Sequence, residues 1–317
     1  MKIYNSIYGL PKLRVGSVFT VGVFDGVHLG HSRILKTLTA RARLSGRKSV
    51  VLTFYPHPMS MLEPGRPVPL LISLQHRLRL LEESGVDAAI LIRFDRRFSV
   101  IKPEVFIRDL LVGRLGMAEI VIGEDFVFGK KGIGDAVLLE ELADKYGYAV
   151  RKVSLLKKSD KTISSTHIRQ LITKGRLKEA KRLLGRPVSI LGTVKKGSRR
   201  GRILGFPTAN IDPHHEAIPP SGVYVVRVIL DGRRYRGILN IGFRPTFHKG
   251  SGPYPPEPVI EVHIIDFRRD IYGKDLEVIF VKRLRDEKRF ADSESLRSRI
   301  KLDVNAARRI LASKRNR

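Results

Sequence analysis

The chain of 317 residues contains no cysteine. Disulfide bonds, thiolate zinc sites and cysteine nucleophiles are therefore excluded, and the composition is typical of a reducing compartment. No run approaches the roughly 18 consecutive apolar residues of a membrane span, and residues 1–16 lack the continuous apolar segment of a secretion signal. We expect a cytoplasmic protein with no membrane partner.

Acidic residues are scarce beside basic ones, with 31 Asp and Glu against 60 Lys and Arg and a formal net charge of +29. Such a charge favours a polyanionic partner, so a basic nucleic-acid-binding protein is one hypothesis. The excess is shared by both halves of the chain, however, and neither a zinc finger, an RNP aromatic motif nor a single basic stripe is found. We therefore expect no specific nucleic-acid partner.

The chain also lacks internal repeats and low-complexity tracts, while 42% of its residues are hydrophobic. This composition indicates a globular protein, and the length favours two domains. In the first half, strand-like runs alternate with amphipathic, helix-like ones, which predicts a parallel sheet with helices on its faces. The strand-like runs lie at residues 17–24, 48–54, 87–94 and 118–123, and the helix-like runs at 32–46, 74–85 and 103–116.

The pattern changes after residue 185 to short strands separated by glycine, proline and aspartate. This spacing predicts an antiparallel sandwich or barrel. The strands are expected at 189–194, 222–230, 233–242, 258–267 and 276–284, with a proline-rich loop at 250–258 and a closing helix from 293 to 317. We therefore predict one domain over residues 1–185 and a second over residues 186–317.

The stretch VGVFDGVHLGH at residues 21–31 carries two histidines where the first strand is expected to end and a helix to begin. Parallel α/β sheets bind ligands at this edge, and free N–H groups at a helix N-terminus favour an anion. The spacing of His28 and His31 places both on one helical face. A phosphate site, a zinc site short of a third ligand and a turn with two exposed histidines all fit the motif.

A second stretch, KKGSRRGRILGFPTANI at residues 195–211, combines glycines with Lys and Arg. Gly197, Gly201 and Gly205 allow phosphates to approach the backbone. Thr208 and Asn210 share one face of an extended chain, and their side-chain oxygens suit Mg²⁺. A solvated basic hairpin or a nucleic-acid patch describes the first half of the stretch equally well.

Both stretches resemble signatures of the bifunctional riboflavin kinase/FMN adenylyltransferases, the bacterial FAD synthetases. Further matching stretches are TFYPHP (53–58), FDRRFSVIKPEVFIRDLL (94–111), VIGEDFVFGKKGIGD (121–135), ISSTHIRQLI (163–172), NIGFRPTF (240–247) and LRDEKRFADSESL (284–296). The resemblance implies a Rossmann-like α/β nucleotidyltransferase domain, followed by an antiparallel six-stranded β-barrel flavokinase domain with a C-terminal helix. It also implies two reactions with ATP and Mg²⁺, in which riboflavin is phosphorylated to FMN and FMN is adenylylated to FAD with release of pyrophosphate.

For the first domain, the resemblance implies that His28 and His31 bind ATP phosphates and stabilise charge in the transition state. It places Asp125 near the nucleotide and a possible Mg²⁺. The ATP-binding set it implies is Gly22, Phe24, Gly26, His28, His31, Asp125, Ser164, Ser165, Thr166 and Arg169. Read from the residues alone, Ser164 to Thr166 are also an ordinary helix N-cap, and Asp125 could hold a turn.

For the second domain, the resemblance implies that Thr208 and Asn210 hold Mg²⁺ and that Glu261 is the general base. The ATP-binding set it implies is Gly197, Arg202, Gly205, Thr208 and Asn210. From the alternation of its strand alone, Glu261 is equally an outward-facing carboxylate. Ser32, His167 and Arg299 depart from the family's usual residues.

The partners expected are therefore ATP, riboflavin and FMN, for a chain that is a monomer or a weak homo-oligomer. A chain with the same fold but one silent site, or with another phosphorylated acceptor, is the nearest alternative.

Overall fold

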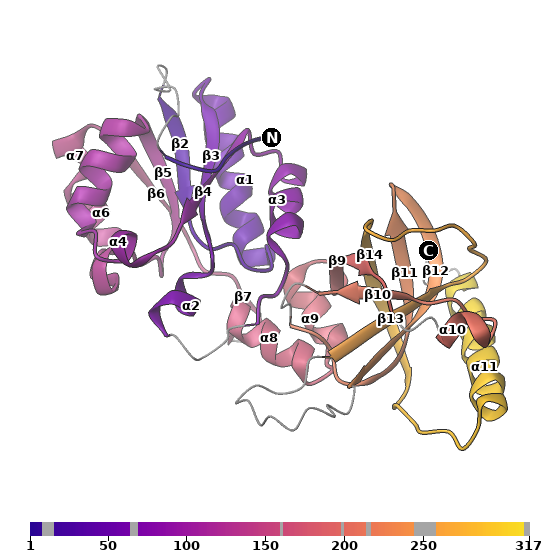
Figure 1. Ribbon diagram of the computed structural model, residues 1–317. Coiled ribbons are helices and arrows are strands. Elements are labelled where there is room, and N and C mark those ends of the chain that lie inside the picture. Colours follow the sequence, from indigo (N-terminus) through magenta and orange to yellow (C-terminus); the bar gives the residue numbers. More distant parts are fainter. Residues whose placement is uncertain are drawn as a thin grey trace. The chain divides into compact units, whose positions relative to one another are not determined.

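The computed structural model describes residues 1–7, 16–63, 69–158, 161–197, 200–213, 217–243 and 258–313. The chain forms two compact units, Met1–Leu70 with Leu74–His167, and Leu71–Ser73 with Ile168–Arg317 (Figure 1). The boundary expected between residues 185 and 186 rests on a change of sequence pattern, which is a different criterion, so it stays a prediction.

A six-stranded sheet in the order β1-β4-β3-β2-β5-β6 forms the centre of the first unit. Every neighbouring pair in it is parallel, which confirms the predicted class of sheet. Figure 1 shows α1 and α3 on one side of this sheet and α6 and α7 on the other. The strands are β1 (Lys2–Tyr4), β2 (Ser17–Val21), β3 (Lys48–Tyr55), β4 (Ala88–Arg93), β5 (Met117–Gly123) and β6 (Ala149–Val153).

Helix α1 (Leu29–Leu44) illustrates how the helices cover the sheet. Leu35, Leu38 and Ala42 recur at helical spacing and are buried, while the remaining positions are largely polar. The other elements of the unit are α2 (Pro58–Leu62), α3 (Leu74–Glu83), α4 (Arg96–Ser99), α5 (Pro103–Val105), η1 (Phe106–Arg114), η2 (Lys130–Gly132), α6 (Ala136–Glu141), α7 (Ala143–Tyr146), β7 (Lys157–Lys158) and β8 (Lys161–Thr162).

Two details of this unit differ from expectation. The strand predicted to run to residue 24 ends at Val21, because Phe24 has a φ of 53°, which no strand accommodates. The helix expected at 103–116 is α-helical only at its start and continues as the π-helix η1. Its wider winding brings the carbonyl oxygen of Arg108 against Gly113, where a Cβ would stand only 2.9 Å from that oxygen.

The second unit is a closed antiparallel barrel in the order β10-β13-β12-β11-β14-β9, which confirms the six-stranded barrel. Its sixth strand, β10, was not among the five runs read from the strand pattern. The proline-rich loop expected at 250–258 lies outside the described residues except for Pro258, where β13 begins. Helix α8 (Ser165–Thr173) begins in the first unit and continues into the second at Ile168. The other elements are α9 (Leu177–Leu184), β9 (Ser189–Lys195), α10 (Arg200–Ile203), β10 (Ala209–Asp212), β11 (Gly222–Leu230), β12 (Arg233–Phe243), β13 (Pro258–Ile264), β14 (Asp275–Arg285) and α11 (Ser293–Ala312).

Helix α11 covers part of the outer wall of the barrel. Val304, Ala307 and Leu311 on the helix form one apolar cluster with Val225 and Ile238 on the strands. The pairing of β11 with β14 shifts register twice, at residues 284 and 281, and both of these side chains pack against the same cluster. At these two β-bulges, strand β14 therefore contributes two extra side chains to the cluster that α11 covers.

Gly192 on β9 is packed too closely for a side chain. A Cβ there would overlap the carbonyl oxygen of Asp212 and a methyl group of Ile211 on the neighbouring β10. We expect Gly192→Ala to lower the free energy of unfolding by about 1–3 kcal/mol, the usual cost of overpacking. Urea unfolding followed by circular dichroism measures this change in the free energy of unfolding. An unfolding midpoint equal to that of wild type would contradict this packing.

Candidate functional site

The carboxyl end of β2 leads into a turn whose backbone is strained. Phe24, Gly26 and Val27 all have positive φ, at 53°, 84° and 38°. A side chain in this left-handed region costs roughly 1–2 kcal/mol, and such strain gathers at functional sites. Phe24 and Val27 are 2% and 5% exposed. Burial of their side chains helps to hold this conformation.

The two histidines follow this turn and lie against each other. His28 is the N-cap of α1 rather than a residue of its first turn, and its Nδ1 accepts a hydrogen bond from the backbone N–H of His31 at 3.3 Å. The two rings stack with centroids 3.7 Å apart and planes at 14°. A Cβ at Gly30 would stand 3.1 Å from Cε1 of His28, which explains why glycine precedes the second histidine.

The serine pair before α8 has both a capping and a bridging role. Ser164 Oγ accepts a hydrogen bond from the backbone N–H of His167 at 3.3 Å, so the N-cap interpretation holds for this residue. Ser165 Oγ instead donates to the carbonyl oxygen of Asp25 at 2.8 Å. That bond joins segments 140 residues apart in sequence and fixes the strained turn beside the start of α8.

These groups surround a cavity of about 270 Å³ at the carboxyl edge of the sheet. It brings together seven of the predicted residues, whereas Gly26, Thr166 and Arg169 do not line it. The seven are Gly22, Phe24, His28, His31, Asp125, Ser164 and Ser165. Ser154, which directly follows β6, also lines it and was missed. Its position at the end of a parallel strand is the signal that could have found it.

In the second unit, strand register assembles a polar row from three neighbouring strands. Glu261 on β13 lies directly opposite Asn210 on β10 and Asn240 on β12. Because directly paired residues point to the same face of a sheet, the three side chains share one face. On β13, the residues on either side of Glu261 are Ile260 and Val262, and both are buried in the barrel interior. Glu261 and the two asparagines paired with it therefore face outward.

The glycine-rich segment before β10 leaves room for Thr208 and Asn210. A Cβ at Gly197 would overlap the Asn210 amide, and one at Gly201 would stand 3.1 Å from the Thr208 hydroxyl. Residues Arg200–Ile203 form a short helical turn within this segment. Gly205 follows that turn with a φ of 83°, and Arg202 is exposed and does not line the cavity described next.

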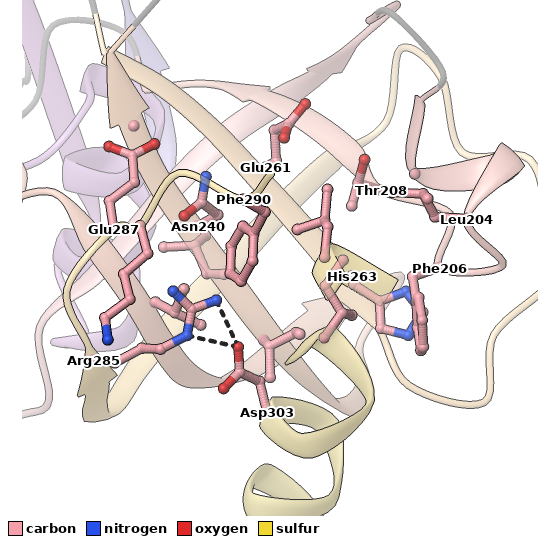
Figure 2. A pocket seen from close by; sticks show the side chains of 18 of the residues that line it. Leu204, Phe206, Thr208, Asn240, Glu261, His263, Arg285, Glu287, Phe290 and Asp303 are labelled. Atoms are coloured by element: carbon pink, nitrogen blue, oxygen red, sulfur yellow. Dashed lines mark hydrogen bonds and ion pairs between the residues drawn. The ribbon is translucent and has the colours of Figure 1, made fainter. Parts of the chain in front are cut away.

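A cavity of about 680 Å³ lies between the outer wall of the barrel and α11. Of the predicted residues, Thr208 and Glu261 line it, while Asn210, Gly197 and Gly205 do not. Figure 2 shows Glu261 and Glu287 at one end, Phe290 near the middle, and Arg285 with Asp303 beside the helix. The residues missed are Asn240, Glu287, Phe290, Arg285 and Asp303, because strand pairing and helix docking bring them here from distant parts of the chain.

His263 shows how the wall of this cavity affects a titratable group. Its Nδ1 lies 2.8 Å from the carbonyl oxygen of Pro207, and its ring packs edge-on against Phe206 with centroids 5.5 Å apart. Burial lowers the pKa of His263, and the bond to Pro207 opposes this shift only in part. The neutral imidazole is therefore the form that the folded protein favours.

The sheet unit and the barrel unit each contain one of these cavities, and the family models that match the two units are those of a nucleotidyltransferase and a kinase, so the chain is a two-site transferase. The FAD synthetase family model matches residues 11–167, and the riboflavin kinase family model matches residues 184–311. Bifunctional riboflavin kinase/FMN adenylyltransferases from Escherichia coli K12 and Bacillus subtilis are each 36% identical, over 97% and 94% of both chains respectively. The chain belongs to the bifunctional riboflavin kinase/FMN adenylyltransferase family.

A solved structure from Streptococcus pneumoniae, described as a macrolide-efflux protein, has the same fold. It is 32% identical, with a TM-score of 0.81 over 96% of this chain and 98% of that one. In the described part of this chain, no helix combines the length and the apolar character needed to cross a membrane. Across the same residues, no three His, Cys, Asp or Glu side chains gather in a cluster that could hold a metal ion.

The lowered pKa of His263 predicts a pH-dependent stability. The unfolded chain takes up a proton at the ordinary histidine pKa, whereas the folded chain takes it up only at lower pH. We therefore expect the stability contributed by neutral His263 to be present above about pH 6.5 and to be lost as the pH falls below it.

Unfolding of wild type and His263→Gln, measured at several pH values between about 5 and 8, tests this. On acidification, the free energy of unfolding of wild type should fall relative to that of His263→Gln. A difference that is independent of pH would show that His263 titrates normally.

Proposed function

We propose that this chain makes FAD in two steps, each with ATP. The barrel unit transfers the γ-phosphoryl group of ATP to the 5′-hydroxyl of riboflavin, which yields FMN and ADP. The sheet unit then joins the phosphate of FMN to the α-phosphorus of a second ATP, which yields FAD and pyrophosphate. The observation that carries this proposal is that each unit has its own cavity, lined by residues within the range that one family model matches.

In the adenylyl transfer, the His28 and His31 rings act as electrostatic stabilisers. An oxygen of the FMN phosphate attacks the α-phosphorus, and charge builds on the phosphate oxygens as pyrophosphate leaves. The start of α1 contributes backbone N–H groups and the helix dipole to the same place. Ser165 holds the turn that presents them, since its hydroxyl is bonded to Asp25. No covalent intermediate on the enzyme is involved.

Asp125 faces the same cavity from the segment after β5. Its carboxylate is a hard oxygen ligand of the kind that Mg²⁺ prefers, so it could hold a metal–nucleotide complex at this edge. Thr166 and Arg169 belong to α8, one of them exposed and the other partly buried. Thr166 belongs to the phosphate-binding set that we propose for this unit, whereas Arg169 lies in the second unit and its part in that set stays a prediction from the family resemblance.

In the kinase reaction, Glu261 accepts the proton of the 5′-hydroxyl as that oxygen attacks the γ-phosphorus. The carboxylate lies on the outward-facing row beside Asn210 and Asn240 and faces the large cavity. The Thr208 hydroxyl and the Asn210 amide, each set against a glycine that leaves space, have the oxygen ligands that would hold Mg²⁺. When bound, the metal neutralises charge on the ATP phosphates.

We also propose that the protein works in the cytoplasm, as a monomer or weak homo-oligomer, with small-molecule partners and no specific nucleic acid. The basic charge is spread over both halves of the sequence rather than forming one stripe, which supports this view.

The direct test is to incubate the purified chain with riboflavin, ATP and Mg²⁺ and to separate the products by chromatography. We expect FMN to appear first and FAD to follow, and chelation of divalent ions with EDTA to stop both reactions. A folded preparation that forms neither product would refute the proposal.

Substitutions should separate the two reactions within one polypeptide. His28→Ala should reduce conversion of supplied FMN to FAD by about 100- to 1000-fold, the usual effect of losing a preorganised stabiliser, and leave FMN formation intact. Glu261→Gln should reduce FMN formation by about 100- to 10,000-fold and leave adenylylation of supplied FMN intact. Each reaction is thus the folding control for the other. Loss of both activities in a folded single variant would contradict the two-site model.

A further inference from the structure

The cavity of the barrel unit contains a charged pair that the phosphoryl transfer does not use. Nε of Arg285, the last residue of β14, donates to Oδ2 of Asp303 on α11 at 2.9 Å, and Nη2 lies 2.8 Å from the same oxygen. The two side chains are only 12% and 4% exposed, and both line the cavity (Figure 2). Because burying charges costs free energy, the pair stands out beside a cavity.

Helix α11 has other attachments to the barrel. Val304, Ala307 and Leu311 pack into the apolar cluster, and Arg308 forms a 2.7 Å ion pair with Asp266 on the outer side. All of these contacts come after Asp303 in the helix. Ile300, which precedes Asp303, packs against the same cluster and also lines the cavity, so the buried pair lies where the attached face of the helix meets the cavity.

Arg285 also organises the loop at residues 286–292. Its Nη1 donates to the carbonyl oxygen of Asp286 at 3.0 Å, and its guanidinium carbon lies 5.7 Å from the centre of the Phe290 ring. At the other end of the loop, Asp292 caps α11 by accepting a hydrogen bond from the backbone N–H of Ser295 at 2.7 Å. The loop is thus held at both ends, and most of its residues line the cavity.

We propose that the Arg285–Asp303 pair positions the 286–292 loop so that the Phe290 ring forms one wall of the flavin site. An aromatic ring of this kind suits a planar tricyclic ligand, which it contacts face-on or edge-on. Phe290 is then a binding residue, and Arg285 and Asp303 are positioning residues that act through it. This inference rests on the proposed kinase function, since it assumes that the large cavity takes riboflavin.

Two variants test the inference by different routes. Phe290→Leu removes the ring and leaves the ion pair intact. Asp303→Asn removes, at nearly constant volume, the carboxylate that pairs with Arg285 and also with Arg299 on α11. Quenching of riboflavin fluorescence, titrated without ATP, gives the Kd for the flavin, and steady-state assays give KM for each substrate and kcat. We expect both variants to raise the Kd and KM for riboflavin by about two- to tenfold, with KM for ATP and kcat within about twofold of wild type.

Asp266→Asn is the matched control, because it removes a carboxylate from an ion pair of α11 outside the cavity. Asp266 has a φ of 61°, a conformation that asparagine tolerates. This control should bind riboflavin like wild type, and all three variants should still adenylylate supplied FMN, which reports an intact chain.

Unchanged riboflavin binding by Phe290→Leu would overturn the proposal. Equal weakening by Asp303→Asn and Asp266→Asn would overturn it too, since the pair would then be only a support for the helix. A wild-type protein that binds riboflavin but forms no FMN would refute the kinase function, while the binding comparison would still decide the role of Phe290. A wild-type protein that binds no riboflavin would overturn both.

Discussion

The alternation of side chains along the barrel strands is the constraint on which the second unit depends. Each strand places every second residue in a closed interior, so Tyr224, Val226 and Val228 on β11 are fully buried. The interior is filled in this way, and polar chemistry is confined to the outer wall. There, antiparallel register places an amide, a carboxylate and a second amide side by side on three strands. The packing of the barrel and the geometry of the site therefore have one cause.

The first unit solves a similar problem with a strained turn. Parallel strands end together at one edge of the sheet, but the strands themselves do not form a row of polar side chains there like the one on the barrel. The chain instead enters α1 through three residues with positive φ, which brings His28 to the helix N-terminus and its ring onto that of His31. The strain is offset by burial of Phe24 and by the bond from Ser165 to Asp25. The turn is consequently held by contacts within the protein itself.

The sequence allowed good prediction wherever a local pattern determined the structure. The parallel sheet, the change to antiparallel strands and the position of His28 and His31 at a strand–helix junction all follow from periodicity and motif. Left-handed φ values at Phe24 and Val27 could not be predicted, because their side chains disfavour that region and only tertiary packing stabilises it. The π-helix could not be predicted either, because its residues fit an α-helix equally well.

The candidate sites divide in the same way. Thr208 and Glu261 could be named because each belongs to a recognisable stretch. Asn240 and Arg285 also lie in stretches that resemble the family, but their part in the site could not be named, because it depends on strand register and on where α11 docks. Asp303 lies in none of these stretches. Gly26 and Arg202 show the opposite case, in which a residue predicted from a motif does not line a cavity. They lie within a motif but line neither cavity, so a shared motif is a weaker guide to contact than a shared face.

The two β-bulges in β14 have a further consequence for how this chain can vary. Since side chains alternate with a period of two, one extra residue turns all later side chains to the opposite face, and a second restores them. Residues 281 and 284 are two such extras, and Arg285 after them lies opposite Val223, which also lines the cavity. A single bulge would leave that guanidinium pointing at the hydrocarbon interior of the barrel. A single insertion or deletion in this strand therefore preserves the cavity only where one bulge is gained or lost with it.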